Sequence, residues 1–286
     1  MKDKKQPNIL VPLDGSIQAH AILPIAGKIA KLSGATLNVV YVGEPPIPPD
    51  EVLGKLGFTP EEAAGLVFNQ LAGCPCEEAK EIVHLAEELH SLFIALSTHT
   101  KKENPRGHLG SVAGEILRTS HIPLIFVQPE RGGREWELKN ILFPDDGSPA
   151  TVEAIHPAVE MARQAGAEML VLYVMNMAES KHEAGSYSSP RYMDQPQHEW
   201  PAWASEFLCR MRGVGRVPSE IKTRLFMAKG EPGAEIVRFS KEHPEVDLIV
   251  LAWHGILEKE KAATMKEVIR HADCPVLVLR VALPVL

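Results

Sequence analysis

The sequence is poor in cysteine, with four among 286 residues. Four cysteines are too few for a disulfide framework in a chain of this length. Cys74 and Cys76 are separated by a single residue, a spacing that suits neither a C-x-x-C redox motif nor a usual zinc site. We therefore expect reduced cysteines and a cytoplasmic protein.

Long apolar runs and an excess of basic residues are also missing. No run of about 18 apolar residues occurs, so we expect no membrane-spanning segment. The net charge is −7 and the lysines and arginines form no basic stripe, which disfavours nucleic-acid partners and anionic membrane surfaces. No signal-peptide pattern precedes the first apolar run at Ile9, and we expect none.

The chain does contain one short sequence motif twice. Residues 8–16 read N-I-L-V-P-L-D-G-S, and residues 140–148 read N-I-L-F-P-D-D-G-S. The offset of 132 residues between Asp14 and Asp146 recurs at the Tyr-Val pairs that end the next apolar run in each half. Two halves with the same order of landmarks indicate one domain duplicated in tandem.

Each half alternates short apolar runs with stretches of helical period. Such alternation predicts parallel sheets with right-handed crossovers, so we expect two α/β domains, each a five-stranded sheet sandwiched by helices. We place domain 1 at residues 1–130, a linker at 131–139 and domain 2 at 140–286, with an inserted surface loop at about residues 176–203. Ligands bind such sheets beyond the carboxyl ends of the strands, where the strand order reverses.

The apolar runs also predict where individual elements begin and end. Expected strands lie at residues 9–11, 37–42, 66–71, 92–96 and 123–127, and again near 141–143, 169–174, 224–228, 248–252 and 275–280. We expect Pro12 to end the first strand and Pro24 to kink the helix that follows it.

The loop after the fourth strand of each half carries the sharpest motif. Ser97-Thr-His-Thr100 is followed after nine residues by Gly110-Ser111, and Ala252-Trp-His-Gly255 after nine residues by Met265-Lys266. This pattern resembles the universal stress protein family, whose nucleotide-binding members carry G-x-x-G, nine residues, then G-S or G-T. An Asp near a Ser after the first strand, a Val ending the second and a Pro before the last agree with the family in both halves. The resemblance implies two Rossmann-like domains of the adenine nucleotide alpha hydrolase type.

The resemblance also implies a nucleotide site in domain 1. There Asp14 and Val42 would contact the nucleoside, and Gly110 and Ser111 the phosphates. Amides and a hydroxyl at the start of a helix suit an anion. Ser97 and Thr100 occupy the two glycine positions, which restricts the backbone without removing its amides. The expected site is Pro12, Asp14, Val42, Ser97, His99, Thr100, Gly110, Ser111 and Val112, with ATP as the ligand and Mg²⁺ bound only together with ATP.

Domain 2 departs further from the family pattern. Met265 has no donor and adds bulk where we expect the phosphate-binding helix to start, whereas Lys266 could attract phosphate as a point charge. We expect a degenerate site in this half, with a structural role as tandem partner or a site for another ligand; the site consists of Asp146, Val174, Ala252, His254, Gly255, Met265 and Lys266.

Other interpretations of the same residues have less support. Haloacid-dehalogenase phosphatases need an aspartate where Pro12 and Pro144 stand, and no phosphoacceptor aspartate of the receiver type ends the third strand. Neither G-x-G-x-x-G nor G-x-x-x-x-G-K-[ST] occurs. We interpret His182, His198 and Glu199 as surface-loop residues rather than metal ligands. We expect no metal site and no catalytic residues.

The combined expectation is a stress-response binding or signalling protein with ATP in domain 1. The alternative is a nucleotide-independent scaffold that binds a partner protein or another small ligand. A slow ATP hydrolase is a third class, but no positioned base or arginine finger is evident. By resemblance, the two domains pair within the chain through Pro123–Val127 and Pro275–Arg280, and a further dimer of two chains is left open.

Overall fold

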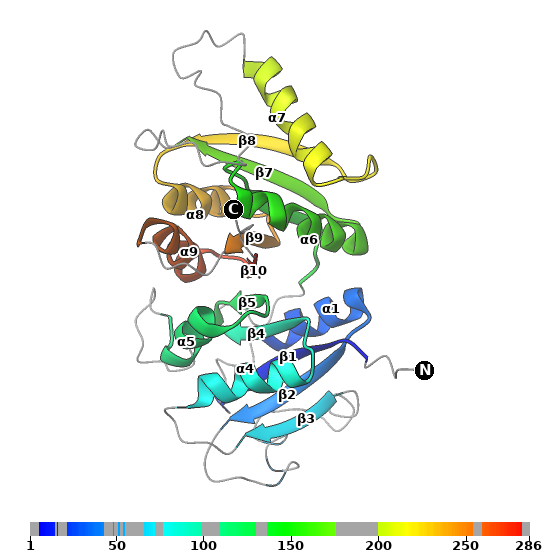
Figure 1. The fold of residues 1–286 in the computed structure, drawn as a ribbon, viewed down its shortest axis with the longest axis vertical. Coiled ribbons are helices and arrows are strands. Elements are labelled where there is room, and N and C mark those ends of the chain that lie inside the picture. Colours follow the sequence, from blue (N-terminus) through cyan, green and yellow to red (C-terminus); the bar gives the residue numbers. More distant parts are fainter. Residues whose placement is uncertain are drawn as a thin grey trace. The chain divides into compact units, whose positions relative to one another are not determined.

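The structure, a computed structural model, describes residues 6–14, 16, 22–42, 48, 51, 54, 66–71, 77–98, 109–129, 136–175, 200–253 and 259–281. The chain divides into two compact units. Unit 1 comprises Met1–Glu137 together with Ile269–Val278, and unit 2 comprises Leu138–Val268 together with Leu279–Leu286. Strands and helices alternate in both, which confirms the predicted α/β class (Figure 1).

Unit 1 is built on a five-stranded parallel sheet. Side by side, its strands are β3 (Leu66–Leu71), β2 (Thr36–Val42), β1 (Asn8–Leu13), β4 (Phe93–Ser97) and β5 (Leu124–Val127). Its helices include α1 (Leu23–Ser33), α4 (Glu78–Glu88) and α5 (Ser111–Thr119), of which α4 and α5 pack against each other (Figure 1). Consecutive residues of β1 are buried, as expected for a parallel sheet covered on both faces.

Unit 2 repeats this arrangement. Its parallel strands lie in the order β9 (Leu248–Trp253), β6 (Asn140–Pro144), β7 (Glu168–Met175) and β8 (Thr223–Lys229), which matches β4-β1-β2-β3. Its helices are α6 (Pro149–Ala165), α7 (Trp200–Val214), α8 (Pro232–Glu242) and most of α9 (Lys259–His271), which is followed by β10 (Val276–Arg280).

The first helix of each repeat ends in the same way. Gly34 after α1 has φ 63° and Gly166 after α6 has φ 64°, and both glycine amides donate back to carbonyls of the last helical turn. This left-handed conformation is strained for residues with a Cβ, so the matching glycines of the two halves end both helices at the same landmark.

The expectation that Pro12 ends the first strand is wrong, because β1 continues to Leu13. Asn8 accepts a hydrogen bond from the amide of Leu92 (2.8 Å), and Pro12, four residues on, directs its nitrogen to the same side of the strand. The register between β1 and β4 ends at Leu10, so the missing N–H of Pro12 costs no ladder bond. The proline therefore lies where β1 and β4 have already separated.

The expectation that Pro24 kinks a helix is also wrong. Pro24 lies in the first turn of α1, directly after the first helical residue. The amides of a first turn have no acceptor within the helix, so a residue without an N–H is accommodated there.

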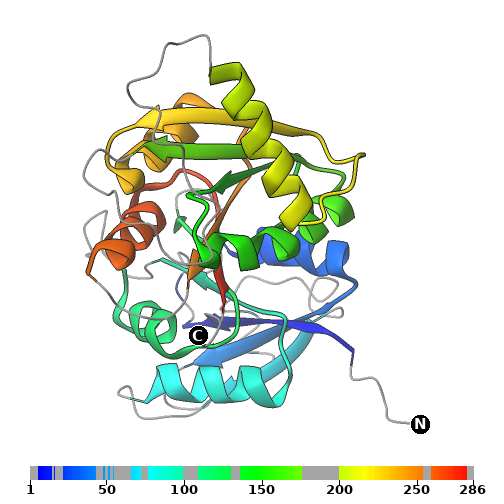
Figure 2. The ribbon, with the colours of Figure 1, turned by 45° about the horizontal axis from the view of Figure 1, so that its top comes forward.

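Residues 200–203, expected in a surface loop, belong to α7 instead. The ring centroid of Trp203 lies 5.3 Å from that of Phe207 and 5.3 Å from that of Tyr173 on β7. Aromatic residues four apart share one helix face, and their burial on the sheet stabilises the helix. Figure 2 shows α7 running across β7 and β8. The rest of the expected insertion, residues 176–199, lies outside the described residues.

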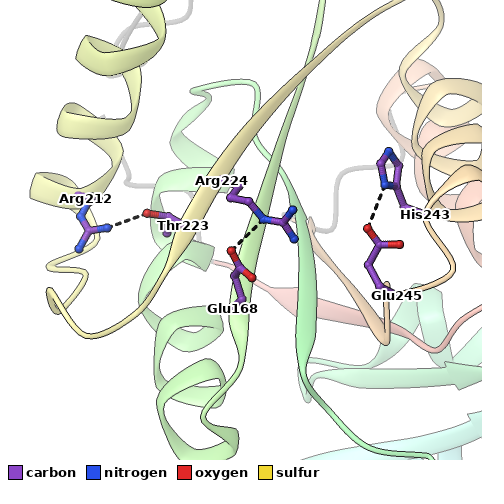
Figure 3. Close-up of polar contacts among 6 residues, drawn as sticks. All are labelled: Glu168, Arg212, Thr223, Arg224, His243 and Glu245. Atoms are coloured by element: carbon purple, nitrogen blue, oxygen red, sulfur yellow. Dashed lines mark hydrogen bonds and ion pairs between the residues drawn. The ribbon is translucent and has the colours of Figure 1, made fainter.

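Polar contacts hold α7 and the edge of this sheet in place (Figure 3). Arg212, in the last turn of α7, donates to the carbonyl of Pro218 (3.0 Å) and to Oγ1 of Thr223 at the start of β8 (2.6 Å). Arg224 of β8 donates to Glu168 of β7 (2.8 Å) across the two neighbouring strands. These bonds fix how the helix returns to the sheet.

Unit 1 also contains an antiparallel pairing of the last strands of the two repeats, as the family resemblance implies. Val276, Leu277 and Val278 of β10 pair with Phe126, Ile125 and Leu124 of β5. All four residues of β5 are buried. An edge strand covered in this way presents no free ladder to other chains.

Candidate functional site

A crevice is expected at the carboxyl ends of β1 and β4, because the strand order of unit 1 reverses between them. The two strands pair only at Ile9–Phe93 and Leu10–Ile94, whereas β1 pairs with β2 along its whole length. The pairing of β1 with β4 therefore stops before the carboxyl ends of the two strands, where the crevice is expected.

Asp14 follows β1 directly and its side chain is exposed. Its Oδ1 accepts a hydrogen bond from the amide of Ser16 (3.0 Å), so the carboxylate shapes its own turn. A carboxylate offers about four lone-pair sites in all, so this bond leaves capacity for a ligand hydroxyl. Pro12 and Val42, at the ends of β1 and β2, are half-buried.

The loop after β4 begins with Ser97, which is half-buried, and Thr98, whose side chain is 2% exposed. The amide of Thr98 donates to the carbonyl of Val127 at the end of β5 (3.0 Å), and its own carbonyl accepts from the amide of Gly110 (2.9 Å). This last bond brings the end of β4 to the start of α5. His99 and Thr100 lie outside the described residues.

Helix α5 begins at Ser111 with Gly110 as its N-cap residue. No side chain of the described residues caps this end, and the amide of Gly114 makes the first hydrogen bond back to Gly110 (2.8 Å). The amides of Ser111, Val112 and the next residue thus have no acceptor within the helix. Ser111 is exposed, so its hydroxyl and these amides form an end suited to an anion.

In unit 2 the turn after β6 is occupied by its own side chains. Oδ1 of Asp146 accepts from the amide of Ser148 (2.9 Å) and from the hydroxyl of Thr151 (3.1 Å), and Ser148 caps α6. Asp145, which replaces the leucine of the first repeat, is 2% exposed and accepts from the amide of Gly147 (2.8 Å). Asp146 thus accepts two hydrogen bonds within its own turn, whereas one such bond to Asp14 is described in the first repeat.

Of the four residues of the expected second site from Val174 to Gly255, the structure describes two. Val174 and Ala252 are half-buried at the ends of β7 and β9. His254 and Gly255 lie outside the described residues.

The expectation that Met265 and Lys266 start a helix is wrong. They lie in the middle of α9, which begins at Lys259, and Met265 is 3% exposed. Counted back from the following strand, Ala263 is the counterpart of Ser111, since each lies 13 residues before β10 or β5. Helix α9 thus extends a further turn in the direction of its N-terminus, and the amides at this level are bonded within the helix.

The described residues contain no group of three or more His, Cys, Asp or Glu side chains that could hold a metal ion. The insertion residues His182, His198 and Glu199 lie outside them. Across the same described part of the chain, every helix is too short or too polar to cross a bilayer.

The model of the universal stress protein family matches residues 7–128 and again residues 137–280. The chain belongs to the universal stress protein family. Its resemblance in motif and its tandem organisation are thereby confirmed.

Individual relatives agree with this membership. Universal stress protein MJ0531 of Methanocaldococcus jannaschii is 30% identical over 152 residues, which cover 50% of this chain and 82% of that protein. A universal stress protein of Archaeoglobus fulgidus superposes with a TM-score of 0.62 over 96% of both chains at 18% identity. The protein PA1789 of Pseudomonas aeruginosa, described as functionally unknown, gives 0.65 over 96% of this chain and 92% of its own, also at 18% identity. These two structures support the fold alone.

Two residues of this universal stress protein that the motif did not indicate lie next to the expected site. Thr98 stands inside the motif loop, and Gln128 follows β5 directly; the hydroxyl of Thr98 donates to Oε1 of Gln128 (3.0 Å). The sequence signal for Thr98 was its place in the motif loop, directly after the apolar run of the fourth strand. Nothing local in the sequence identifies Gln128.

Proposed function

We propose that unit 1 binds ATP at the separated ends of β1 and β4, and that the protein acts as a nucleotide-dependent binding protein in a stress response. The observation that carries this proposal is the start of α5. It has no side-chain cap among the described residues, and the bond from Gly110 to Thr98 holds it against the end of β4. Family membership supplies the biological setting.

The proposed roles follow from the chemistry of each group. The amides of Ser111 and Val112, with the Ser111 hydroxyl, donate to phosphate oxygens at the positive end of the helix dipole. Asp14 accepts from ribose hydroxyls with the capacity that its turn leaves free. Pro12 and Val42 offer apolar surface to the base. Ser97, His99 and Thr100 complete the loop around the phosphates.

Mg²⁺ would arrive with the triphosphate. This ion usually takes most of its ligands from water and phosphate and only one or two from carboxylates. Asp14, whose carboxylate keeps acceptor capacity beyond the bond from Ser16, fits that limited role.

Unit 2 is proposed to bind no nucleotide at the equivalent edge. Asp146 accepts two hydrogen bonds within its own turn, and α9 has no helix start at the level of Met265 and Lys266. These observations favour a second function for this half, as a nucleotide-independent surface for a partner protein or another small ligand.

The first experiment looks for nucleotide carried by the purified protein. The chain is denatured and the supernatant is separated by anion exchange, and calorimetry then follows titration of the emptied protein with Mg-ATP. Co-purified ATP or a binding heat at millimolar ligand is expected. An empty extract without any heat would favour the scaffold function for both units.

The second experiment changes the proposed phosphate site without disturbing the fold. Gly110 has φ −56° and ψ 153°, ordinary values for an N-cap, and among the described residues a Cβ there would meet only the Thr98 carbonyl, at 3.6 Å. In Gly110→Asp the carboxylate caps the amides and repels phosphate, so we expect Mg-ATP affinity to fall by more than about tenfold with stability retained.

Two variants control for this change. Gly110→Asn caps the same helix without charge, and is expected to weaken binding less than Gly110→Asp does. Ala263→Asp, at the exposed counterpart of Ser111 in α9, is expected to leave affinity unchanged. Equal affinity in Gly110→Asp and the unaltered protein would refute the site.

A further inference from the structure

Gln128 connects two segments that lie far apart in the sequence. Its Oε1 accepts from the hydroxyl of Thr98 (3.0 Å), and its Nε2 donates to the carbonyls of Ile269 (2.9 Å) and Arg270 (2.8 Å). Carbonyl oxygens can only accept, so two of them fix which end of the amide is the nitrogen. All four residues belong to unit 1.

One end of this bridge is part of the proposed nucleotide site. Thr98 is 2% exposed and its backbone is bonded to Val127 on one side and to Gly110 on the other. Because the Gly110 amide is directed by the Thr98 carbonyl, the position of Thr98 sets where α5 begins. A change at Gln128 therefore reaches the uncapped amides of Ser111 and Val112 through a single buried residue.

The other end is the last turn of α9. Ile269 and Arg270 are among the last three residues of that helix. Carbonyl groups at this end accept no hydrogen bond from an amide further along the helix. Gln128 supplies the missing donor and so caps α9 from a distant part of the chain. The same helix runs back through residues 259–268, which belong to unit 2.

We propose that Gln128 is a positioning residue that links nucleotide binding in unit 1 to the order of the last turn of α9, and through that helix to the second repeat. The proposal rests on the proposed function, because it assigns a regulation to the same site. Linkage is reciprocal: a ligand that fixes the start of α5 fixes Thr98 and Gln128, and a fixed α9 end favours the binding-competent site.

Two substitutions distinguish the hydrogen bonds of Gln128 to α9 from its bond to Thr98. Gln128→Glu keeps an oxygen that accepts from Thr98, but it removes the donor to α9 and places a negative charge at a helix C-terminus, where it is unfavourable. Gln128→Leu removes both bonds without adding charge. Gln164→Leu is the matched control, because Gln164 bonds only to Glu160 on its own exposed helix face among the described contacts.

The test is hydrogen–deuterium exchange on the full chain, with and without Mg-ATP. Without ligand, Gln128→Leu is expected to speed exchange several-fold at the Gly110 amide and at residues 269–271. Gln128→Glu is expected to speed it at residues 269–271 alone. With Mg-ATP, the unaltered protein should slow at residues 111–113 and at residues 269–271, whereas Gln128→Glu should slow only at residues 111–113.

Calorimetry gives the second readout. Both Gln128 variants are expected to weaken Mg-ATP binding by about fivefold, at the lower end of typical coupling between sites. Gln164→Leu should leave the affinity and both exchange patterns unchanged. Because Gln128→Leu carries no charge, a loss seen in both variants is not a repulsion of phosphate.

The outcomes separate this proposal from the one on which it rests. If Mg-ATP slows residues 111–113 but Gln128→Leu and Gln128→Glu behave as the unaltered protein does, the link is refuted and the nucleotide site stands. If Mg-ATP has no effect on any form, the nucleotide site fails. The ligand-free exchange at Gly110 in Gln128→Leu then decides alone whether Gln128 connects α5 to α9.

Discussion

At the scale of single residues, the start of the second repeat depends on Asp247. Its Oδ2 accepts from the amides of Lys139 and Asn140, both at 2.8 Å, and so anchors the chain as it enters β6. In the first repeat neutral groups anchor the start of β1, since the side chain of Asn8 donates to the carbonyl of Leu89 and accepts from the hydroxyl of Ser91. Burial raises the pKa of Asp247, although the two backbone amides oppose that rise.

Removing the acceptor should cost stability. Asp247→Ala leaves two backbone amides without their partner, and we expect the free energy of unfolding to fall by about 1 kcal/mol. Asp247→Asn keeps a carbonyl oxygen at this position and should lose less. Urea unfolding at neutral pH measures both; a larger loss in the Asn variant than in the Ala variant would contradict this account of the contact.

The raised pKa of Asp247 also predicts a pH dependence with a definite sign. A carboxyl whose folded pKa lies above its unfolded value contributes stability that is fully present below the unfolded pKa and is lost as pH rises through the folded pKa. Relative to Asp247→Asn, the unaltered protein should therefore lose stability as pH rises from about 4 through the range in which the buried carboxyl ionises. A difference between the two proteins that does not change with pH in urea unfolding would show that burial does not govern this carboxyl.

At the scale of elements, the apolar strands and the repeat could be predicted because their signals are local. The runs around Ile9 and Ile141 need only neighbours in sequence to be recognised as buried strands. The start of α9 could not be predicted from motif spacing, since a loop of constant length can hold helix starts at different positions. The segment K-E-K-A-A-T-M-K-E has no glycine or proline, so the helix extends to Lys259, whereas Gly110 stands at the start of α5.

The bridge through Gln128 was beyond prediction for a different reason. Its partners on α9 lie 141 and 142 residues away, and no pattern near Gln128 reports them. The same limit applies to Pro12, whose place inside a strand is explained only by the separation of β1 from β4.

Close packing at the end of α7 gives a prediction for a pair of glycines. A Cβ on Gly215 would lie 2.0 Å from Cγ2 of Ile155 on α6, so Gly215→Ala should destabilise the protein by about 1–3 kcal/mol. A Cβ on Gly213, in the same helix end, would meet no atom of the described residues within 4 Å, and Gly213→Ala should stabilise the protein by about 0.5 kcal/mol. Urea unfolding of both variants gives the comparison; equal effects would mean that α7 and α6 are not in this close contact.

At the scale of the whole molecule, unit 1 is completed by a segment from the far end of the chain. Residues 269–278 are counted with it, and β10 pairs with β5 there. Unit 1 therefore includes residues that belong to the second repeat in sequence, although each repeat has its own strand order.

This completion predicts the behaviour of the first repeat alone. A fragment of residues 1–137 would leave the buried strand β5 as an open edge, so we expect it to self-associate or to unfold at lower urea than the full chain does. Light scattering after gel filtration and urea unfolding check this. A monomeric fragment with undiminished stability would show that the β10 pairing contributes nothing.

The central claim is that only the first repeat keeps a helix start able to hold phosphate. The most direct measurement is the stoichiometry of Mg-ATP binding to the full chain by equilibrium dialysis, repeated with Gly110→Asp. We predict a single nucleotide per chain, and none in the variant at the same ligand concentration. Two nucleotides per chain, or one that persists in Gly110→Asp, would contradict the account.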